Sequence, residues 1–432
     1  MRQTPGPCRS GRLRVQPARL FTNGPKGRIV YAMLLYIHVP FCRSRCGYCA
    51  FHSHPVGEGG RREIAGYAAI LAAEIALWGE RLGKARVDTV FFGGGTPSLL
   101  PAKSVRVIMD RLRAAFDIAP AAEISFEANP ESFIRLGYAH ELKKAGITRV
   151  SLGVQSLSDE KLKLLGRVHG AREAELAVTL ARQAGFASLN LDCIWGLPGQ
   201  RPRDWMRELQ NFVRMQPDHF SCYGLTLEEG TPFSDALHAG TLSLPPEKEQ
   251  GHMYLDGADF LESQGYLQYE ISNFARMGFQ CRHNLGYWEG TDYLGLGPSA
   301  VSTIMGRRWT NPYALDEWAA GVREKRICGD IEELSPQTRV LESIMLRLRT
   351  TRGLRVKAYR ELTGRDFMKD NRALLHALHR EGLIRILNGY VRLTRTGMLV
   401  SNTILTRLFE DVEEKLTPLP PGETPPVPGE KA

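Results

Sequence analysis

The sequence predicts an α/β protein in which a partial (β/α)6 barrel, similar to an incomplete TIM barrel, carries a C-terminal helical and winged-helix-like module. Three observations lead to this prediction. Short β-branched and aromatic runs alternate with amphipathic segments, three of the amphipathic segments end close to a glycine, and an Asn-Gly pair separates two apolar runs near the C-terminus. The alternation is typical of βαβ units, in which parallel strands are covered by helices.

The alternating runs predict six strands, at residues 34–38, 89–92, 123–127, 149–154, 188–194 and 220–223. The helices expected between them cover residues 66–82, 104–116, 133–144, 171–184 and 203–215. Gly83, Gly146 and Gly185 follow three of these helices, where a left-handed glycine commonly ends a helix. Six strands are enough to curl a sheet into a partial barrel, whose functional groups lie where the strands end.

Changes in composition divide the chain further. We expect the partial barrel at residues 33–245, a helical and aromatic-rich extension at 246–334, and a winged-helix-like domain at 335–410. In that last region, three helical patterns precede apolar runs on either side of Asn388-Gly389, which is a strong hairpin signal. Residues 411–432 are rich in Pro, Gly and Glu and are expected to form a disordered tail.

The leader, residues 1–32, is expected to be disordered and carries most of the net charge of +9. It has no Asp or Glu and seven basic residues, namely Arg2, Arg9, Arg12, Arg14, Arg19, Lys26 and Arg28. An Arg-rich, acid-free leader is typical of an organellar transit peptide, but its prolines and glycines interrupt any amphipathic helix. Met33 begins the first apolar run, so a start assigned too far upstream is favoured over targeting. The body of the chain is close to neutral. It contains no apolar run long enough to span a membrane. We therefore expect a cytoplasmic protein.

Three of the eight cysteines, Cys42, Cys46 and Cys49, fall within eight residues. Their thiolates can converge from one tight loop on three corners of an iron–sulfur cube. Two alternatives remain open: the spacing also fits one face of a helix, and the three thiolates with His52 would satisfy tetrahedral zinc. Pro40 and Gly47 disfavour a regular helix, and zinc sites usually draw their ligands as separated pairs. The other cysteines stand singly and are expected to be structural.

Further polar and glycine-rich features follow the predicted strands. Gly93-Gly94-Gly95-Thr96-Pro97 comes directly after the second strand and would let bare backbone approach a ligand, although a tight turn explains it equally well. Near other strand ends lie the polar residues Glu127, Gln155, Arg167 and Asp192. Each is individually typical of a surface or network residue, but four on one rim suit a charged, hydroxylated ligand.

The segment Tyr36-Ile-His-Val-Pro-Phe-Cys42-x3-Cys46-x-Tyr48-Cys49, followed by the glycine run, resembles the radical S-adenosylmethionine (SAM) superfamily. Within it, the chain is similar to the branch of the oxygen-independent coproporphyrinogen III oxidases and the haem chaperones of the HemW type, over residues 33–409. The resemblance implies a radical SAM barrel in which the three cysteines hold a [4Fe-4S] cluster whose open iron is chelated by SAM. In the enzymes of this family, an electron from the cluster cleaves SAM to methionine and a 5′-deoxyadenosyl radical.

The resemblance also implies roles for individual residues. Gly94, Gly95 and Thr96 should contact the methionine end of SAM, and Tyr48 should pack beside the cluster and the adenine. The positions that match SAM contacts of the oxidases are Tyr36, Glu127, Gln155, Arg167 and Asp192.

Two features separate the relatives within this branch. The oxidases have a further cysteine two residues after the last cluster ligand, where this chain has Phe51. Residues 283–288, His-Asn-Leu-Gly-Tyr-Trp, are similar to the HNxxYW signature of the chaperones. His283 is therefore the candidate axial haem ligand, with a buried core histidine as the alternative, and His52 and His54 are weaker candidates.

The resemblance favours a haem chaperone that binds haem, a [4Fe-4S] cluster and SAM and delivers haem to client haem proteins. The alternative is an enzyme of porphyrin biosynthesis, an oxygen-independent coproporphyrinogen III oxidase. A nucleic-acid-binding role for the winged-helix-like domain is also conceivable, because Arg347, Arg349, Arg352, Arg355 and Lys357 lie close together. Glu342 and Glu361 flank this run, and mixed charges are typical of a solvated face, so no nucleic-acid partner is expected.

Overall fold

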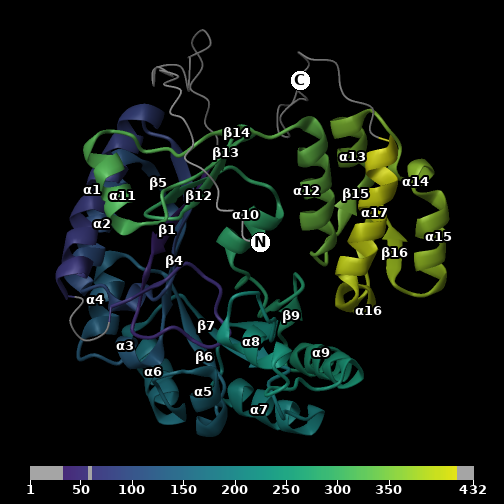
Figure 1. Cartoon of the computed structure of the whole chain (residues 1–432), viewed down its shortest axis with the longest axis horizontal. Helices are drawn as coiled ribbons and strands as arrows, with labels where there is room; N and C mark the ends of the chain where they lie inside the picture. The colour runs from purple at the N-terminus through teal and green to yellow at the C-terminus, as the bar shows by residue number, and fades with distance from the viewer. Residues whose placement is uncertain (1–32, 57–60, 416–432) are drawn as a thin grey trace, which may run out of the picture.

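The computed structural model describes residues 33–56 and 61–415, and its centre is a twelve-stranded sheet that curves into an open barrel (Figure 1). The six strands expected from the sequence are confirmed and lie side by side in chain order. They are β1 (Met33–Val39), β4 (Arg86–Gly94), β5 (Asp117–Ala128), β6 (Arg149–Gln155), β7 (Ser188–Trp195) and β8 (His219–Gly224). All five pairings between them are parallel, so their carboxyl ends form a single rim.

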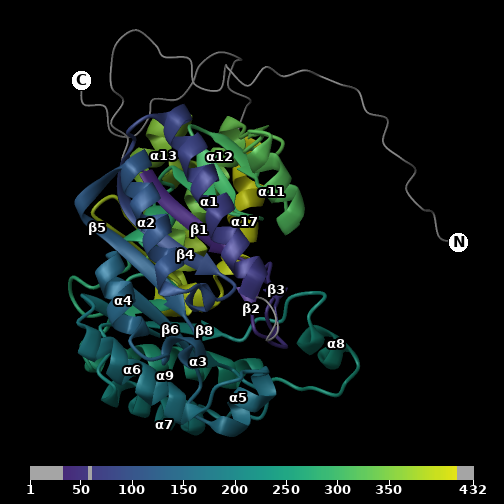
Figure 2. The same cartoon turned by 90° about the vertical axis from the view of Figure 1, so that its left-hand side faces the viewer.

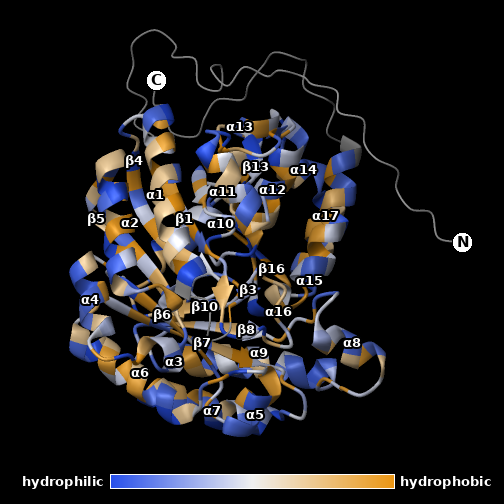
Figure 3. Cartoon of the chain, turned by 60° about the vertical axis from the view of Figure 1, so that its left-hand side comes forward, coloured by the Kyte–Doolittle hydropathy of each residue, from blue (hydrophilic) through white to orange (hydrophobic). Residues whose placement is uncertain are grey.

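Helices cover the outer face of this parallel part. The expected helices correspond to α1 (Arg61–Leu82), α2 (Ala102–Ala115), α6 (Ala171–Ala184) and α7 (Pro202–Arg214). Apolar and polar residues mix along these outer helices, as one buried and one exposed face require (Figure 3). Fully buried side chains such as Leu35, Ile37, Phe92, Phe126 and Val150 join the strands to the helices.

The bounds predicted for the helix at residues 133–144 are wrong. Two helices, α3 (Pro130–Phe133) and α4 (Tyr138–Ala145), take its place, because Gly137 adopts a left-handed φ of 71° immediately before α4. A further helix, α5 (Asp159–Leu165), was not expected at all. The expected glycine ends are confirmed, since Gly83, Gly146 and Gly185 all have positive φ after a helix.

The extension after the parallel strands is less helical than expected. Helix α8 (Pro232–His238) precedes the extension. The extension contains α9 (Glu247–Ser263), α10 (Arg282–Trp288) and α11 (Leu315–Arg323), and it also supplies six strands of the same sheet. Beside β8 lie β10 (Asn273–Ala275) and β9 (Leu267–Gln268); beside β1 lie β11 (Tyr293–Leu296), β12 (Val301–Ile304), β13 (Arg307–Thr310) and β14 (Glu332–Glu333). Only β11 continues the parallel order, by pairing with β1. The two edge strands, β14 and β9, do not pair with each other, so the barrel stays open.

One buried carboxylate connects the extension to the barrel. Glu74 of α1 is fully buried, and it accepts hydrogen bonds from the Gly297 amide at 2.8 Å, Asn311 Nδ2 at 2.9 Å and Trp318 Nε1 at 3.1 Å. Burial raises the pKa of Glu74 from its ordinary value near 4.5 to about 7, although these hydrogen bonds act in the opposite direction.

This raised pKa makes stability depend on pH. Between about pH 4.5 and about pH 7 the folded state holds a proton that the unfolded state has lost, so the free energy of unfolding should fall by roughly 3 kcal/mol as pH rises through this window. Glu74→Gln should lack this fall. Urea unfolding at about pH 5 and about pH 8 measures it. The exposed Glu80→Gln, on the same helix, is the control; an equal pH slope in wild type and Glu74→Gln would contradict the assignment.

The C-terminal part consists of helices around a small antiparallel sheet. Its helices are α12 (Pro336–Leu348), α13 (Val356–Thr363), α14 (Phe367–Asp370), α15 (Arg372–Arg380), α16 (Arg395–Leu399) and α17 (Ser401–Lys415); its strands are β15 (Leu354–Arg355), β16 (Ile384–Leu387) and β17 (Tyr390–Leu393). The expected hairpin is confirmed: β16 pairs with β17, and Asn388 and Gly389 both have positive φ. These elements have their own apolar core, and Arg395 connects them to α9 through ion pairs with Asp259 and Glu262.

Several basic residues of this part are paired with acids. Arg347 and Arg352 both face Glu289, at 3.7 Å and 3.2 Å, and Lys357 faces Glu361 at 3.6 Å. Helix α17 runs to Lys415, so the prediction of a disordered tail is wrong for residues 411–415. The interpretations of residues 1–32 and 416–432 lie outside the described residues. Within the described part, none of the helices has the length and apolar character that crossing a bilayer requires.

Candidate functional site

The three clustered cysteines follow β1: Cys42 ends the short strand β2 (Phe41–Cys42), and Cys46 and Cys49 lie on the connection to the parallel strand β3 (His54–Pro55). We name this segment the cysteine loop. Figure 2 shows these two strands at the margin of the barrel. The Cys49 amide donates a hydrogen bond to the Cys46 carbonyl at 3.2 Å, which closes a turn. No helix forms between residues 43 and 53. The helical interpretation of the cysteine spacing is therefore wrong, and the thiols project from a tight loop.

Two of the thiols already face hydrogen-bond donors. All three are free and partly exposed. The hydroxyl of Thr96 lies 3.5 Å from Cys42 Sγ, and Arg167 Nη1 lies 3.7 Å from Cys46 Sγ. Burial raises the pKa of the Cys42 and Cys49 thiols, while the Thr96 side chain acts to lower that of Cys42. These donors are oriented to stabilise the thiolates that iron or another metal binds.

The glycine turn at the end of β4 packs backbone to backbone against this loop. Gly94 has a φ of 109°, and a Cβ there would come within 2.6 Å of the His38 ring. A Cβ on Gly95 would lie 2.6 Å from the carbonyl oxygen of Phe41, and the Thr96 amide donates to that same oxygen at 2.7 Å. Only residues without side chains allow so close an approach, so the turn is more specific than an ordinary connection between strand and helix.

Asn129, which sequence reasoning did not select as a site residue, connects these parts. Its side-chain oxygen accepts a hydrogen bond from Arg167 Nη2 at 2.6 Å, and its amide nitrogen donates to Thr96 Oγ1 at 3.1 Å. Arg167 Nη2 also donates to the Gly153 carbonyl at 2.7 Å. A signal for Asn129 was present in the sequence, because the residue lies two positions after the end of a predicted strand.

The polar residues predicted near strand ends gather around two strand glycines. A Cβ on Gly93 would lie 3.0 Å from the Tyr36 ring and 3.1 Å from the Glu127 carboxylate. A Cβ on Gly153 would lie 3.0 Å from Asn129 Oδ1, 3.1 Å from Gln155 Nε2 and 3.4 Å from Arg167 Nη2. Gln155 has a φ of 68°, uncommon for a residue with a side chain, at the end of β6. The barrel therefore brings Tyr36 and Glu127 together, and Gln155 and Arg167 together.

Glu127 and Asp192 are two buried carboxyl groups of the barrel strands. Asp192 accepts hydrogen bonds from Asn190 Nδ2 at 2.7 Å and from the Ser151 hydroxyl at 3.3 Å. Burial raises the pKa of Glu127 to about 8, with a further contribution from the charge of Asp192, and burial also raises the pKa of Asp192. A cationic or hydrogen-bond-donating ligand would favour the ionised carboxylates, so this pair suits a positively charged or hydroxylated molecule.

The rings of Tyr48 and Tyr36 contact different aromatic neighbours. The Tyr48 ring lies 6.4 Å from that of Phe233 on α8. The Tyr36 ring stacks on Phe91 at 6.3 Å, and its hydroxyl lies 3.2 Å from His38 Nδ1. His38 was also missed by sequence reasoning, although it follows Tyr36 on the same face of β1.

His283 lies in the core at the start of α10, with no exposed surface. Its ring stacks on Phe91 at 5.0 Å and meets the edge of Tyr287 at 4.8 Å. The Nδ1 atom lies 2.7 Å from Thr89 Oγ1, whereas Nε2 is buried without a partner in the described part of the chain. Burial lowers the pKa of His283 to about 3, so the imidazole is neutral at physiological pH. A ligand as large as haem can reach Nε2 only if the surrounding rings move.

Three exposed rings lie at the cysteine loop, namely Phe51 and His52 on the loop itself and Tyr313, which contacts His52; we name these three residues the exposed ring cluster. Phe51 is 70% exposed and Tyr313 62% exposed, and the His52 ring meets the Tyr313 ring edge-on at 5.4 Å. The neighbouring His54 pairs with Glu63 at 3.3 Å.

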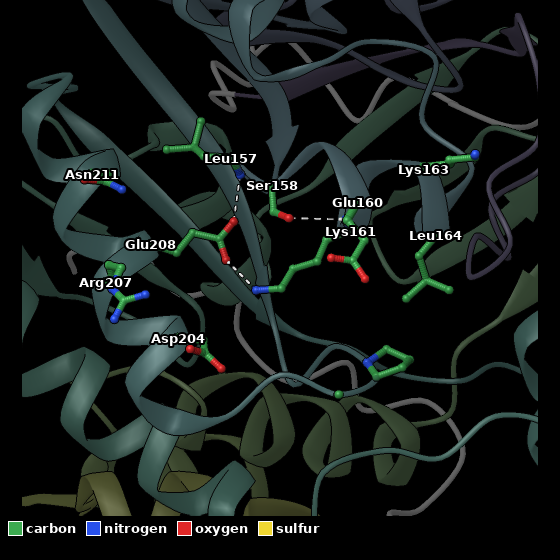
Figure 4. A pocket seen from close by; sticks show the side chains of 12 residues that line it. Leu157, Ser158, Glu160, Lys161, Lys163, Leu164, Asp204, Arg207, Glu208 and Asn211 are labelled. Carbon is green, nitrogen blue, oxygen red and sulfur yellow. Dashed lines mark hydrogen bonds and ion pairs between the residues drawn. The ribbon is translucent and has the colours of Figure 1, made fainter.

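A groove of about 670 Å³ lies on the outside of the barrel, between α5 and α7 (Figure 4). Lys161 and Glu208 form an ion pair of 3.2 Å in its wall, and Glu208 also accepts from the Leu157 amide at 2.7 Å. None of the site residues predicted from the sequence lines this groove. Its Lys161–Glu208 ion pair connects α5 to α7, so we assign the groove to the support of these two helices rather than to the rim.

The residues at the rim fit an iron–sulfur cluster better than a single metal ion. Three thiols are the usual protein ligands of such clusters, and Gly95 keeps their loop against the turn by close backbone contact. Across residues 33–56 and 61–415, no three His, Cys, Asp or Glu side chains are arranged to hold one ion, so the zinc interpretation gains no support. A four-iron cluster holds its thiolates farther apart than one ion does.

Comparisons with known proteins agree with this geometry. The family model of the radical SAM superfamily matches residues 36–211, and that of the HemN C-terminal domain matches residues 334–400. The heme chaperone HemW of Mycobacterium tuberculosis is 39% identical over 323 residues, which cover 74% of this chain and 82% of that protein. The heme chaperone HemW of Bacillus subtilis is 33% identical over 376 residues, which cover 85% of this chain and 97% of that protein. The structure of coproporphyrinogen III oxidase (HemN) from Escherichia coli, a radical SAM enzyme, is similar with a TM-score of 0.76 at 24% identity, covering 88% of this chain and 91% of that one.

Proposed function

Because this chain belongs to the radical SAM superfamily, in the coproporphyrinogen III oxidase-like family that includes the heme chaperone HemW, we propose that it is a haem chaperone. It binds haem, a [4Fe-4S] cluster and SAM, and it transfers haem to client haem proteins. The observation that carries the proposal is the exposed ring cluster beside the cysteine loop. Phe51 of that cluster stands where the oxidases have a further cysteine, and it is open to solvent.

In this proposal Cys42, Cys46 and Cys49 hold the cluster, which supplies an open iron for the amino and carboxylate groups of SAM. The residues of the chain bind SAM and orient it. The bare backbone of Gly94 and Gly95 packs against the His38 ring and the Phe41 carbonyl, where a Cβ would clash, and this packing holds the turn that contacts the methionine end of SAM. Glu127 and Asp192 accept hydrogen bonds from its amino or hydroxyl groups. Tyr36, Tyr48, Gln155 and Arg167 complete the contacts, as the resemblance implies.

The proposed haem contact is the exposed ring cluster rather than His283. His52 is exposed and has an imidazole able to bind haem iron, and Phe51 and Tyr313 offer rings that stack on a porphyrin face. His283 has a neutral ring of the right kind, but no part of it is exposed. Its proposed role is to fix α10 against β4 through Thr89 and Phe91.

Oxygen-independent coproporphyrinogen III oxidase is the second candidate, favoured by the fold shared with the enzyme from Escherichia coli over 88% of this chain. The buried carboxyl groups of Glu127 and Asp192 are compatible with either candidate. Both candidates need the same cluster and SAM contacts, so an assay of substrate turnover distinguishes them.

We expect anaerobically reconstituted protein to bind haem, with a visible Soret band, and to form no vinyl product from coproporphyrinogen III with SAM and a reductant. His52→Ala should weaken haem binding at least about tenfold, because it removes the exposed iron ligand. His283→Ala should keep the haem affinity but lower the melting temperature, since it leaves a cavity in the core.

His140→Ala, at an exposed site on α4, is the matched control and should bind haem as wild type does. Vinyl products would make the protein an oxidase. Wild-type protein that binds no haem would refute the chaperone. If haem binding were lost in His283→Ala but unchanged in His52→Ala, the haem ligand would be His283 of α10 instead.

A further inference from the structure

The side chain of Asn129 is fixed in one orientation by its two partners. A guanidinium only donates hydrogen bonds, so the atom that lies 2.6 Å from Arg167 Nη2 must be the oxygen of the amide. The nitrogen therefore points to Thr96 Oγ1, at 3.1 Å, and donates to it. The backbone is held as well, because the Asn129 amide donates to the Ser98 hydroxyl at 3.1 Å.

This orientation determines where the hydroxyl proton of Thr96 points. The oxygen of Thr96 already accepts from Asn129, so its single proton is free to be donated elsewhere. Cys42 Sγ lies 3.5 Å away, and a metal-bound thiolate can only accept. Thr96 is buried, so water does not compete readily for this proton. The amide of Asn129 thus directs a proton toward one cysteine sulfur.

The other end of the amide acts on a second sulfur. By accepting from Arg167 Nη2, Asn129 holds the guanidinium with Nη1 3.7 Å from Cys46 Sγ. The Gly153 carbonyl supports the same nitrogen at 2.7 Å. One side chain therefore orients the donors of two of the three clustered cysteines.

We propose that Asn129 is a positioning residue that sets the reduction potential of the cluster by orienting the hydrogen bonds that Thr96 and Arg167 give to Cys42 and Cys46. This inference rests on the proposed cluster ligation by the three cysteines. Hydrogen bonds to cluster sulfurs stabilise the more negatively charged, reduced state and so raise the reduction potential. An aspartate of the same shape has only acceptor atoms, so it would draw the Thr96 proton to itself and away from Cys42.

The experiment uses full-length protein with a reconstituted cluster and no SAM, so that its readout does not depend on turnover. Redox titration followed by electron paramagnetic resonance gives the midpoint potential. Electron–nuclear double resonance of the reduced cluster detects exchangeable protons near the sulfurs, and the coupling that disappears in Thr96→Val belongs to the Thr96 hydroxyl. We expect Asn129→Asp to lose this same coupling and to have a more negative midpoint potential than wild type.

A double-mutant cycle separates the redirected proton from the added charge. In a Thr96→Val background the proton is already absent, so Asn129→Asp should shift the potential less than it does in wild type. Asn402→Asp, an exposed site on α17, should leave both signals unchanged. A retained proton coupling in Asn129→Asp, or an equal shift in both backgrounds, would overturn the proposal. Wild-type protein that takes up no cluster would instead refute the ligation on which it rests.

Discussion

Replacing Cys42, Cys46 or Cys49 by alanine will abolish the iron–sulfur absorbance of anaerobically reconstituted protein. With three protein ligands for four irons, the cluster has no spare thiolate, so losing any one ligand leaves two irons without a protein donor. The described residues offer no other cysteine on this loop as a substitute. Iron and sulfide analysis together with the visible spectrum measures the effect, and we expect both contents to fall close to background in each variant.

Cys328→Ala is the matched control for this loss. Cys328 is also a partly exposed, free thiol, and Arg81 Nη1 lies 3.3 Å from its sulfur, much as Arg167 does at Cys46. It stands outside the cysteine loop, so its replacement should leave iron and sulfide unchanged. Wild-type iron content in any of the three loop variants would remove that cysteine from the ligand set.

Gly95→Ala is expected to weaken SAM binding at least about tenfold and to lower cluster content. The added methyl group would lie 2.6 Å from the carbonyl oxygen of Phe41, closer than atoms in proteins approach. Because that atom belongs to the backbone of the cysteine loop, the loop itself has to move, at a cost of roughly 1–3 kcal/mol. Equilibrium binding of SAM to reconstituted protein and the melting temperature of the cluster-free chain measure the two consequences.

Gly66→Ala provides the comparison for this substitution. Gly66 is exposed in α1, and a Cβ there would meet nothing within 4 Å. Alanine is the better helix former by about 1 kcal/mol, so this variant should melt slightly higher and bind SAM normally. Normal SAM affinity in Gly95→Ala would show that the turn does not seat the ligand.

The parallel strands could be predicted because each carries a run of β-branched and aromatic residues that is buried on both faces. Strands β11, β12 and β13 could not, since each has four residues and their place in the sheet depends on β1, far away in the sequence. The break between α3 and α4 depends on the left-handed conformation of Gly137. It could not be predicted, because an isolated glycine is often tolerated within a helical pattern.

In the candidate site, too, local features could be predicted from the sequence, whereas features that depend on distant contacts could not. The cysteines and the glycine turn can be recognised from the sequence because they are local motifs. Asn129 acts through Thr96 and Arg167, which the fold brings to it from two other segments. The sequence indicates a histidine at position 283 that could bind iron, but its burial depends on Phe91 and Tyr287, and only the packed structure reveals it.

The place of β1 between β4 and β11 has a consequence for how the protein is made. During synthesis β1 can pair with β4 early, but its other edge stays free until the ribosome has reached Tyr293. Such distant pairing gives a high contact order, which slows folding, and a free apolar edge invites association with other nascent chains. The strand that leads into the cysteine loop is therefore among the last to be completed, so we expect efficient production to depend on protection of that edge by chaperones.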